Sequence, residues 1–483
     1  MGKLGKNKEL SRFEMTIFAA GDIYGGGGQI IISFFYLIFL TDYVKIQPAL
    51  AGTVILISKV WDAVNDPLMG FITDNTRSRW GRRKPYFLVG FFAILAAYFL
   101  LWYPISHESE FVRFAYVLVT YLLYSTVSTI VAIPYAAMSS EITQDYKKRN
   151  SVNGLRLIFS QCSSLICAVL PLEIVKLFED PKEGYIAMSL SFGLLFSIPF
   201  ILMFFFTHER VPLAKEKSKF SIKEFLAPFK VKSFRYLIFM YLFAFMAMDV
   251  VSTVFAYYMN YFLKRPSELN YVLGAMLITQ IILIPAVIAI SNRVGKARTY
   301  MYSAIIWAIG IVVLSVQSTA FPPWAIYVNA VLIGIGLIGC IVLPWVMYPD
   351  VADVGELYAG KRNAGSFSGI MTFMRNISSA FAIFIVSYIL QFSGYVKPAS
   401  EVVNGVTKTI LMDQPSSLIW ALKGIVVGVP LIALFIASLA AKKYPLSRER
   451  HELLMEYLKF QRGESKESPL KEKELETLKS EII

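Results

Sequence analysis

Trp61-Asp62-Ala63-Val64-Asn65-Asp66-Pro67 decides the fold, because this stretch places two carboxylates within an apolar helix. The residues from Pro48 to Lys59 before it are largely apolar, and those from Leu68 to Ile72 after it are apolar again. An ionisable side chain at the centre of a bilayer costs about 2.5–3.5 kcal/mol, so acids there usually serve ions, protons or substrates. The stretch therefore predicts a membrane helix with a functional polar face.

The polar side chains Asp62, Asn65 and Asp66 share one face of that helix, at i, i+3 and i+4. Two carboxylates and an amide oxygen are hard ligands, which suit a small hard cation. Two close carboxylates also titrate as a coupled pair, so a proton is a second candidate for the site. The alternative interpretation is a polar helix end at the membrane interface, which Asp66-Pro67 simply closes.

Composition places the rest of the chain in the membrane as well. Of the 483 residues, 56% are hydrophobic, above the share of about 45–50% that is typical of soluble domains. We read apolar stretches of about 20 residues as membrane spans. Twelve candidate spans lie near residues 14–42, 47–72, 84–104, 111–136, 152–177, 185–207, 233–263, 268–292, 299–318, 323–348, 364–393 and 414–441. The chain is therefore expected to be an all-α polytopic membrane protein.

The net charge of +13 reports membrane topology rather than a nucleic-acid partner. Basic residues gather at the N-terminus and after spans two, four, six, eight and twelve, which all lie on one side if the spans alternate. By the positive-inside rule that side is the cytoplasm. We therefore expect a multi-pass protein of the cell inner (plasma) membrane with both termini in the cytoplasm.

The longest polar interruption between spans leaves six spans on either side of it, as in transporters built from two pseudo-symmetric bundles. The predicted organisation is an N-terminal six-helix bundle, a cytoplasmic linker, a C-terminal six-helix bundle and a cytoplasmic tail, over residues 1–207, 208–232, 233–441 and 442–483. In the tail, Glu452 to Phe460 is expected to form an amphipathic helix, and the charged run after Arg462 is expected to be disordered.

The loop after span two reads GFITDNTRSRWGRRK over residues 70–84. It resembles the glycine, aspartate and basic loop of the major facilitator superfamily (MFS), which implies an ion-paired latch at the cytoplasmic end. Gly70 would permit close helix packing there. The expected latch residues are Asp74, Arg77, Arg79, Arg82 and Arg83. Without the resemblance, the loop would read as a positive-inside anchor.

Joined to the first motif, this loop gives WDAVNDPLMGFITDNTRSRWGRRKPY, which resembles the glycoside–pentoside–hexuronide:cation symporter family of the MFS. Further agreements extend the resemblance over nearly all of the membrane region. They are Thr41-Asp42, Thr129 with Ile133-Pro134-Tyr135, Arg156, and PDVADVGELYAGKRNAGSFSG over 349–369. The resemblance implies a twelve-helix MFS fold of two six-helix bundles that works by alternating access.

Members similar to melibiose permease hold a coupling cation, usually sodium, with two aspartates, an asparagine and a threonine. By this resemblance the cation ligands here would be Asp62, Asn65, Asp66 and Thr129. Lys59 lies one turn before Asp62. It would either balance charge when the cation site is empty or extend its ammonium to the membrane interface.

The sugar site departs from the family pattern. Arg156, at the start of span five, is present, but Ala132 replaces the acid expected in span four. The lysine expected in span eleven is replaced by Asn376, with Arg375 beside it. The acid expected in span one falls in Gly25 to Gly28, so Asp22 is the candidate there, about one turn earlier.

Several other residues are candidates for the substrate site. Arg156 and Arg375 could bind a carboxylate or a phosphate in a bidentate manner. The aromatic rings of Tyr36 and Trp345 could stack on a sugar or line a lipid-like tail, with ordinary helix packing as the alternative. Asp249, an acid within span seven, would face a cavity or pair with a basic neighbour.

The segment between spans ten and eleven also matches the family's loop, through Asp350, Asp353 and Arg362. The resemblance implies that its acids pair with cytoplasmic bases and stabilise one access state. The alternative is a solvated loop.

These features predict a secondary active symporter that couples entry of sodium, or of protons, to uptake of a glycoside, pentoside, hexuronide or related sugar. The alternative is a symporter of a lysophospholipid or another amphiphile with the same fold. An enzyme is not expected, because the three histidines lie outside the spans and no nucleophile–base pair stands out. We expect no cofactor apart from the coupling ion, and a monomer.

Overall fold

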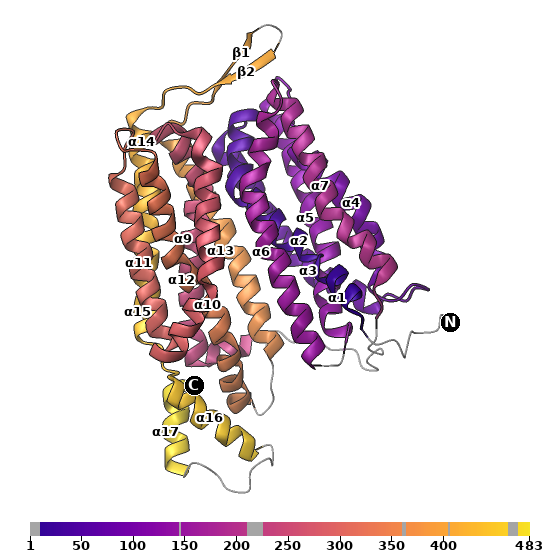
Figure 1. Ribbon diagram of the computed structural model, residues 1–483, viewed down its shortest axis with the longest axis vertical. Coiled ribbons are helices and arrows are strands. Elements are labelled where there is room, and N and C mark those ends of the chain that lie inside the picture. The colour runs from indigo at the N-terminus through magenta and orange to yellow at the C-terminus, as the bar shows by residue number, and fades with distance from the viewer. Residues whose placement is uncertain (1–9, 144–145, 210–225, 360–363, 404–405, 462–471) are drawn as a thin grey trace. The chain divides into compact units, whose positions relative to one another are not determined.

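The computed structural model describes residues 10–143, 146–209, 226–359, 364–403, 406–461 and 472–483. Helices dominate these residues, and their only strands form one antiparallel hairpin of β1 (Ala399–Val403) and β2 (Val406–Ile410). Figure 1 shows the helices as long, roughly parallel rods within each part of the chain.

The first expected span is not one continuous α-helix. It consists of α1 (Arg12–Ala19), α2 (Asp22–Ile31) and two π-helical turns, η1 (Ile32–Tyr36) and η2 (Phe39–Tyr43). The next five expected spans are long helices. They are α3 (Pro48–Asn75), α4 (Lys84–Trp102), α5 (Glu110–Glu141), α6 (Tyr146–Lys176) and α7 (Pro181–Phe206).

The second half of the chain begins with α9 (Lys232–Tyr257), which continues into the π-turn η4 (Tyr258–Phe262). The helices that follow are α10 (Leu269–Val294), α11 (Lys296–Val316), α12 (Trp324–Ala359) and α13 (Ala364–Phe392). The last expected span is built from α14 (Ser416–Lys423), the π-turn η6 (Gly424–Gly428) and α15 (Val429–Lys442). Short 3-10 turns, η3 (Ala227–Lys230) and η5 (Pro266–Glu268), precede α9 and α10.

Within the described ranges, 10 helices are long and apolar enough to cross a membrane. Two of the twelve expected spans are not among them. One is the interrupted first span, and the other is α3, which carries Lys59, Asp62 and Asp66. The all-α polytopic class expected from the sequence is therefore confirmed.

The chain forms two compact units. Unit 1 comprises Met1–Glu216, Ser252–Gly274 and Ile383–Leu422, and unit 2 comprises Lys217–Val251, Ala275–Ala382 and Lys423–Ile483. Each unit has its own aromatic core. Tyr36, Tyr98, Trp102 and Tyr185 are fully buried in unit 1, and Tyr241, Tyr300 and Trp307 are fully buried in unit 2. The division into two six-span bundles, 1–207 and 233–441, stays a prediction.

The glycine run of the first span lets α2 pack tightly against α6. A Cβ atom on Gly26 would lie 2.4 Å from the backbone oxygen of Ser160, and one on Gly27 would lie 2.2 Å from Ser163 Oγ. Ser163 Oγ donates a hydrogen bond to the carbonyl oxygen of Ile23 at 2.7 Å. The run therefore serves close approach of a neighbouring helix, which only glycine allows.

The tail is more ordered than its composition suggests. It contains α16 (Arg448–Gln461) and α17 (Glu472–Ile482). Ile482 is fully buried, and Ser233 Oγ donates a hydrogen bond to the carbonyl oxygen of Ile482 at 2.7 Å. The backbone amide of Lys232 donates to the carbonyl oxygen of Ile483 at 2.6 Å. The expectation of disorder is wrong for 472–482, because α17 docks on the start of α9. Residues 462–471 lie outside the described ranges.

Candidate functional site

Two acids of α3 face two hydroxyls of α5. Thr129 Oγ1 donates a hydrogen bond to Asp66 Oδ1 at 2.7 Å, and Ser125 Oγ donates one to Asp62 Oδ1. The two aspartates are four residues apart on α3 and the two hydroxyls four apart on α5, so the contacts repeat after about one helical turn. The packing of α3 against α5 thus builds two successive carboxylate–hydroxyl pairs.

Asn65 lies between the two aspartates in the sequence of α3. Its side chain is buried, and within the described part of the chain Asn65 Nδ2 has no hydrogen-bond partner. Of the four residues expected at a cation site, Asp66 contacts Thr129 directly, Asp62 lies one turn before Asp66, and Asn65 is adjacent to Asp66 in the sequence of α3. Carboxylate, amide and hydroxyl oxygens are ligands for a hard cation.

Lys59 is also part of this face. Lys59 Nζ lies 3.2 Å from Asp62 Oδ2, and the two side chains are only 19% and 13% exposed. The lysine thus turns toward the acid on its own helix, which is the first of the two arrangements considered from the sequence. Asp66 interacts electrostatically with both Asp62 and Lys59.

Ser125 was missed by sequence reasoning. The available signal was its spacing, since it lies one turn before Thr129 on the same helix, just as Asp62 lies one turn before Asp66. Its contact with Asp62 depends on the register between α3 and α5, which helix spacing alone does not determine.

The candidate substrate residues of unit 1 form an ion pair across two helices. Arg156 Nε, on α6, lies 2.5 Å from Asp22 Oδ2 at the start of α2. Tyr135 Oη, on α5, accepts a hydrogen bond from the same nitrogen at 3.1 Å. The Arg156 guanidinium also stacks over the Tyr135 ring, 4.7 Å from its centroid. The arginine is therefore neutralised and held in place.

Unit 2 contains a matching pair. Arg375, on α13, donates to both carboxylate oxygens of Asp249, on α9, at 2.5 and 2.8 Å. The guanidinium lies 4.6 Å from the centroid of the Phe245 ring. Of the two arrangements considered for Asp249, the structure has the one in which this acid pairs with a base. Its side chain is only 5% exposed.

The remaining substrate candidates differ in exposure. Tyr36 is completely buried and packs against Trp102 and Tyr121, so it belongs to the aromatic core and offers no surface to a solute. Trp345 is 43% exposed, and its ring contacts that of Tyr241 edge to face. Asn376 is half-buried beside Arg375.

The loop before α4 makes a contact that the sequence did not predict. The backbone amides of Arg82 and Arg83 donate to the carboxylate of Glu209, at 2.9 and 2.6 Å. This acid follows α7 and was not predicted to take part. Its charge lies at the N-terminus of α4, where the helix dipole favours an anion. Arg77 and Arg79 are exposed.

Two of the expected latch features stay predictions. The side chain of Asp74 lies outside the described parts of the chain. At Gly70, a Cβ atom would meet no heavy atom of the described residues within 4 Å, and the following residues Phe71 and Ile72 are 63% and 43% exposed. Close helix packing at Gly70 stays a prediction.

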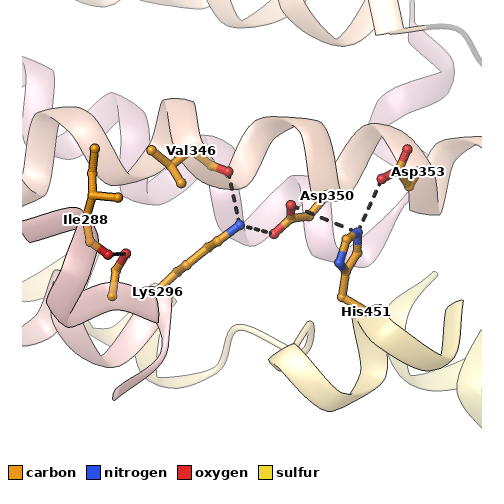
Figure 2. Close-up of polar contacts among 7 residues, drawn as sticks. Ile288, Lys296, Val346, Asp350, Asp353 and His451 are labelled. Atoms are coloured by element: carbon orange, nitrogen blue, oxygen red, sulfur yellow. Dashed lines mark hydrogen bonds and ion pairs between the residues drawn. The ribbon is translucent and has the colours of Figure 1, made fainter. Parts of the chain in front are cut away.

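The acids near the end of α12 pair with bases from two other elements (Figure 2). Lys296 Nζ, at the start of α11, lies 2.6 Å from Asp350 Oδ2 and donates to the carbonyl oxygen of Val346 at 3.2 Å. His451 Nε2, on α16, lies 3.2 Å from Asp353 Oδ2 and 4.0 Å from Asp350 Oδ1. These contacts tie the tail to α12. Arg362 lies outside the described residues.

Asp42 is a further buried acid, at the C-terminal end of the first span. Asp42, on η2, accepts hydrogen bonds from the hydroxyls of Tyr261 and Tyr395, the former at 2.8 Å. Thr41 Oγ1 lies 2.7 Å from the hydroxyl oxygen of Tyr257. Burial raises the pKa of Tyr395, and the charge of Asp42 raises it further, so this tyrosine remains a donor.

Comparisons with known proteins show which family the chain resembles. A family model described as MFS/sugar transport protein matches residues 17–448. An uncharacterized symporter of Synechocystis sp., sll1374, is 25% identical, and the match covers 90% of this chain and 94% of the relative. The isoprimeverose transporter of Lactiplantibacillus pentosus is also 25% identical, with 76% and 77% covered.

A second group of relatives is named for a different substrate. The sodium-dependent lysophosphatidylcholine symporter 1-A of Danio rerio is 24% identical, with 100% of this chain and 94% of the relative covered. Among solved structures, a bacterial homologue of the iron transporter ferroportin in its inward-facing state gives a TM-score of 0.63. That match is 14% identical and covers 90% of this chain and 99% of the other. It shows the MFS-type fold alone.

Proposed function

Because the chain belongs to the MFS/sugar transport protein family, we propose that it is a secondary active symporter that couples sodium entry to uptake of a sugar-like solute. Transport proceeds by alternating access. The electrical part of the driving force is about 2.3 kcal/mol per charge for each 100 mV. A proton in place of sodium is the alternative for the coupling ion.

One observation carries this proposal: the two carboxylate–hydroxyl pairs between α3 and α5. Asp62 and Asp66 bring two negative charges into a helix flanked by apolar residues, where each is costly unless a cation compensates it. A bound cation bridges α3 and α5 through Asp66 and Thr129. Reciprocity then requires that solute and cation raise each other's affinity by the same factor.

The state of the two arginines supports a neutral, hydroxyl-rich solute. A free arginine favours anions, whereas Arg156 and Arg375 are each neutralised by an aspartate, Asp22 and Asp249. An aspartate–arginine pair offers acceptors and donors side by side, which suits sugar hydroxyls. We therefore place a glycoside or pentoside ahead of a hexuronide. The substrate for which the isoprimeverose transporter is named belongs to this class.

A second candidate function is sodium-coupled transport of a lysophospholipid. The observation that favours it is the relative that covers 100% of this chain, the sodium-dependent lysophosphatidylcholine symporter. The presence of Ala132 in place of an acid agrees with that function as well, because alanine cannot accept hydrogen bonds from sugar hydroxyls. Both candidates share the cation site and differ only in the solute.

The distribution of basic residues indicates the orientation of the protein in the membrane. We propose that the protein spans the inner (plasma) membrane as a monomer, with both termini in the cytoplasm. The ends of α12 and α16 that meet at His451 then lie on the cytoplasmic side, and Asp42 lies on the outer side.

Thermal stability of the purified protein tests the proposal. The probes are isoprimeverose, glucuronate and lysophosphatidylcholine, each in sodium and in choline. A ligand that binds only the folded state adds about 2.7 kcal/mol of stability at 100 times its dissociation constant. We expect isoprimeverose to raise the midpoint more in sodium than in choline. A response to lysophosphatidylcholine alone would move the assignment to the lipid.

The matched variants are Asp66→Asn, which removes a carboxylate from the cation face, and Asp413→Asn, which removes a carboxylate that is 96% exposed. We expect the first variant to lose the sodium response and the second to keep it. A sodium response that survives in Asp66→Asn would rule out the cation site on α3.

A further inference from the structure

The position of Lys59 has a consequence for the order of binding events at the cation site. Asp62 uses both carboxylate oxygens: Oδ2 lies 3.2 Å from Lys59 Nζ, and Oδ1 accepts from Ser125 Oγ. A coupling cation that binds Asp62 must share or take over these oxygens. An ammonium group and a hard cation compete for the same lone pairs.

The net charge of the site indicates how the Lys59 ammonium and the cation replace one another. Asp62, Asp66 and Lys59 together carry one net negative charge when all three are ionised. Without the lysine they would carry two, and with both the lysine and a monovalent cation they carry none. Uncompensated charge within the membrane region is costly. The lysine therefore lowers the cost of the cation-free state, and the cation in turn brings the site to neutrality.

We propose that Lys59 is a tethered counter-ion of the cation site, whose ammonium occupies Asp62 in the cation-free protein and is displaced from Oδ2 when the cation binds. This inference rests on the proposed cation coupling and adds a residue to it. Lys59 is a positioning residue, because it acts through Asp62 and sets the affinity of the site for the cation. It also allows the cation-free protein to switch between its two access states without two uncompensated carboxylates.

The lysine is held for this role by its surroundings. It lies three residues before Asp62 on the same helix, so the two side chains meet over one turn. The side chain of Lys59 is 19% exposed, whereas Lys264, which pairs with Asp413, is 67% exposed. The Lys264 pair is the matched control, because an exposed pair contributes little.

Equilibrium binding of radioactive sodium to the purified full chain tests the inference. We compare the native protein with Lys59→Met, Lys59→Arg and the control Lys264→Met. Removal of the competing ammonium should tighten sodium binding by about tenfold, as expected for loss of a charged hydrogen bond. Lys59→Arg should bind sodium within about threefold of the native protein, since it keeps the charge. Lys264→Met should not change the affinity.

The outcomes separate this inference from the proposed function. A damaged fold would weaken binding, so tighter binding in Lys59→Met is not explained by a structural role of the lysine. Unchanged or weaker binding in Lys59→Met, with native binding intact, overturns the counter-ion inference and leaves sodium coupling standing. No sodium binding in the native protein or in Lys264→Met overturns sodium coupling, and the inference falls with it.

Discussion

Arg375 binds both carboxylate oxygens of Asp249, and this contact repeats the ion pair of Arg156 with Asp22 in a second sequence position. Asp22 is in expected span one and Arg156 in span five, whereas Asp249 is in span seven and Arg375 in span eleven. If the chain is divided after span six, these positions correspond to each other. The two ion pairs therefore join equivalent spans of the two halves that the sequence predicts.

The first prediction concerns Asp249→Asn, which leaves the Arg375 guanidinium without its charge partner. Breaking a buried pair from one side costs about 3–5 kcal/mol, because a charge stays buried and unpaired. We expect a clear fall in the thermal midpoint, and a partial return in the double variant Asp249→Asn, Arg375→Gln. The control Asp413→Asn breaks an exposed pair and should have little effect. A midpoint that is lower in the double variant than in Asp249→Asn would contradict this account.

The second prediction concerns solute charge. Asp22→Asn frees the guanidinium of Arg156 from its carboxylate at 2.5 Å, so the site gains a positive charge. We expect binding of glucuronate to improve by about tenfold relative to isoprimeverose, since a charged hydrogen bond contributes about 1.5–3 kcal/mol. Competition binding with the two probes measures the ratio. The control is Asp180→Asn, at the N-cap of α7. An unchanged ratio in Asp22→Asn would place solute binding away from this pair.

The third prediction concerns the tail. Ile482 is fully buried on α17, and full burial of such a side chain contributes about 1.5–3 kcal/mol. Ile482→Asp should therefore release α17 from the start of α9. We expect faster cleavage of the tail in limited proteolysis, with an unchanged sodium affinity. The control Ser480→Asp adds the same charge at an exposed position of the same helix. Equal cleavage in the two variants would show that docking of α17 does not depend on Ile482.

Sequence reasoning reached those parts of the molecule that depend on local pattern. The apolar runs predicted the helical membrane class, and the spacing of Asp62, Asn65 and Asp66 predicted their common face on α3. These features follow from helical periodicity and the cost of burying charge. Family resemblance added Thr129, which no periodicity within α3 could supply.

What the sequence could not supply depends on contacts between distant segments. Glu209 was read as part of a linker, yet it accepts from the amides of Arg82 and Arg83, more than a hundred residues earlier. The composition of 472–482 is typical of disorder, but the burial of Leu478 and Ile482 makes it a docked helix. Such pairings follow from the packing of the whole chain, which composition does not report.

The fourth prediction returns to Ser125, whose Oγ donates to Asp62 Oδ1. Ser125→Ala removes one oxygen from the cation face and leaves that carboxylate oxygen without its donor. A hydroxyl oxygen is a ligand for a hard cation, so a cation that loses Ser125 Oγ is held less tightly, and we expect sodium binding to weaken by about tenfold, which is about 1.4 kcal/mol. Equilibrium sodium binding measures the change. Thr120→Val is the control, because Thr120 is buried on the same helix and its Oγ1 donates to the carbonyl oxygen of Val117.

Ser125→Ala also distinguishes a ligand from a spacer. If Ser125 oxygen binds the cation, Ser125→Thr should retain the native affinity, since it keeps the hydroxyl, whereas Ser125→Ala and Ser125→Val should both lose it. If the residue only spaces α3 from α5, side-chain volume decides the result, and the alanine variant should bind sodium as well as the native protein does. Tighter or equal binding in Ser125→Ala would therefore exclude Ser125 from the cation site and leave Thr129 as the hydroxyl ligand of α5.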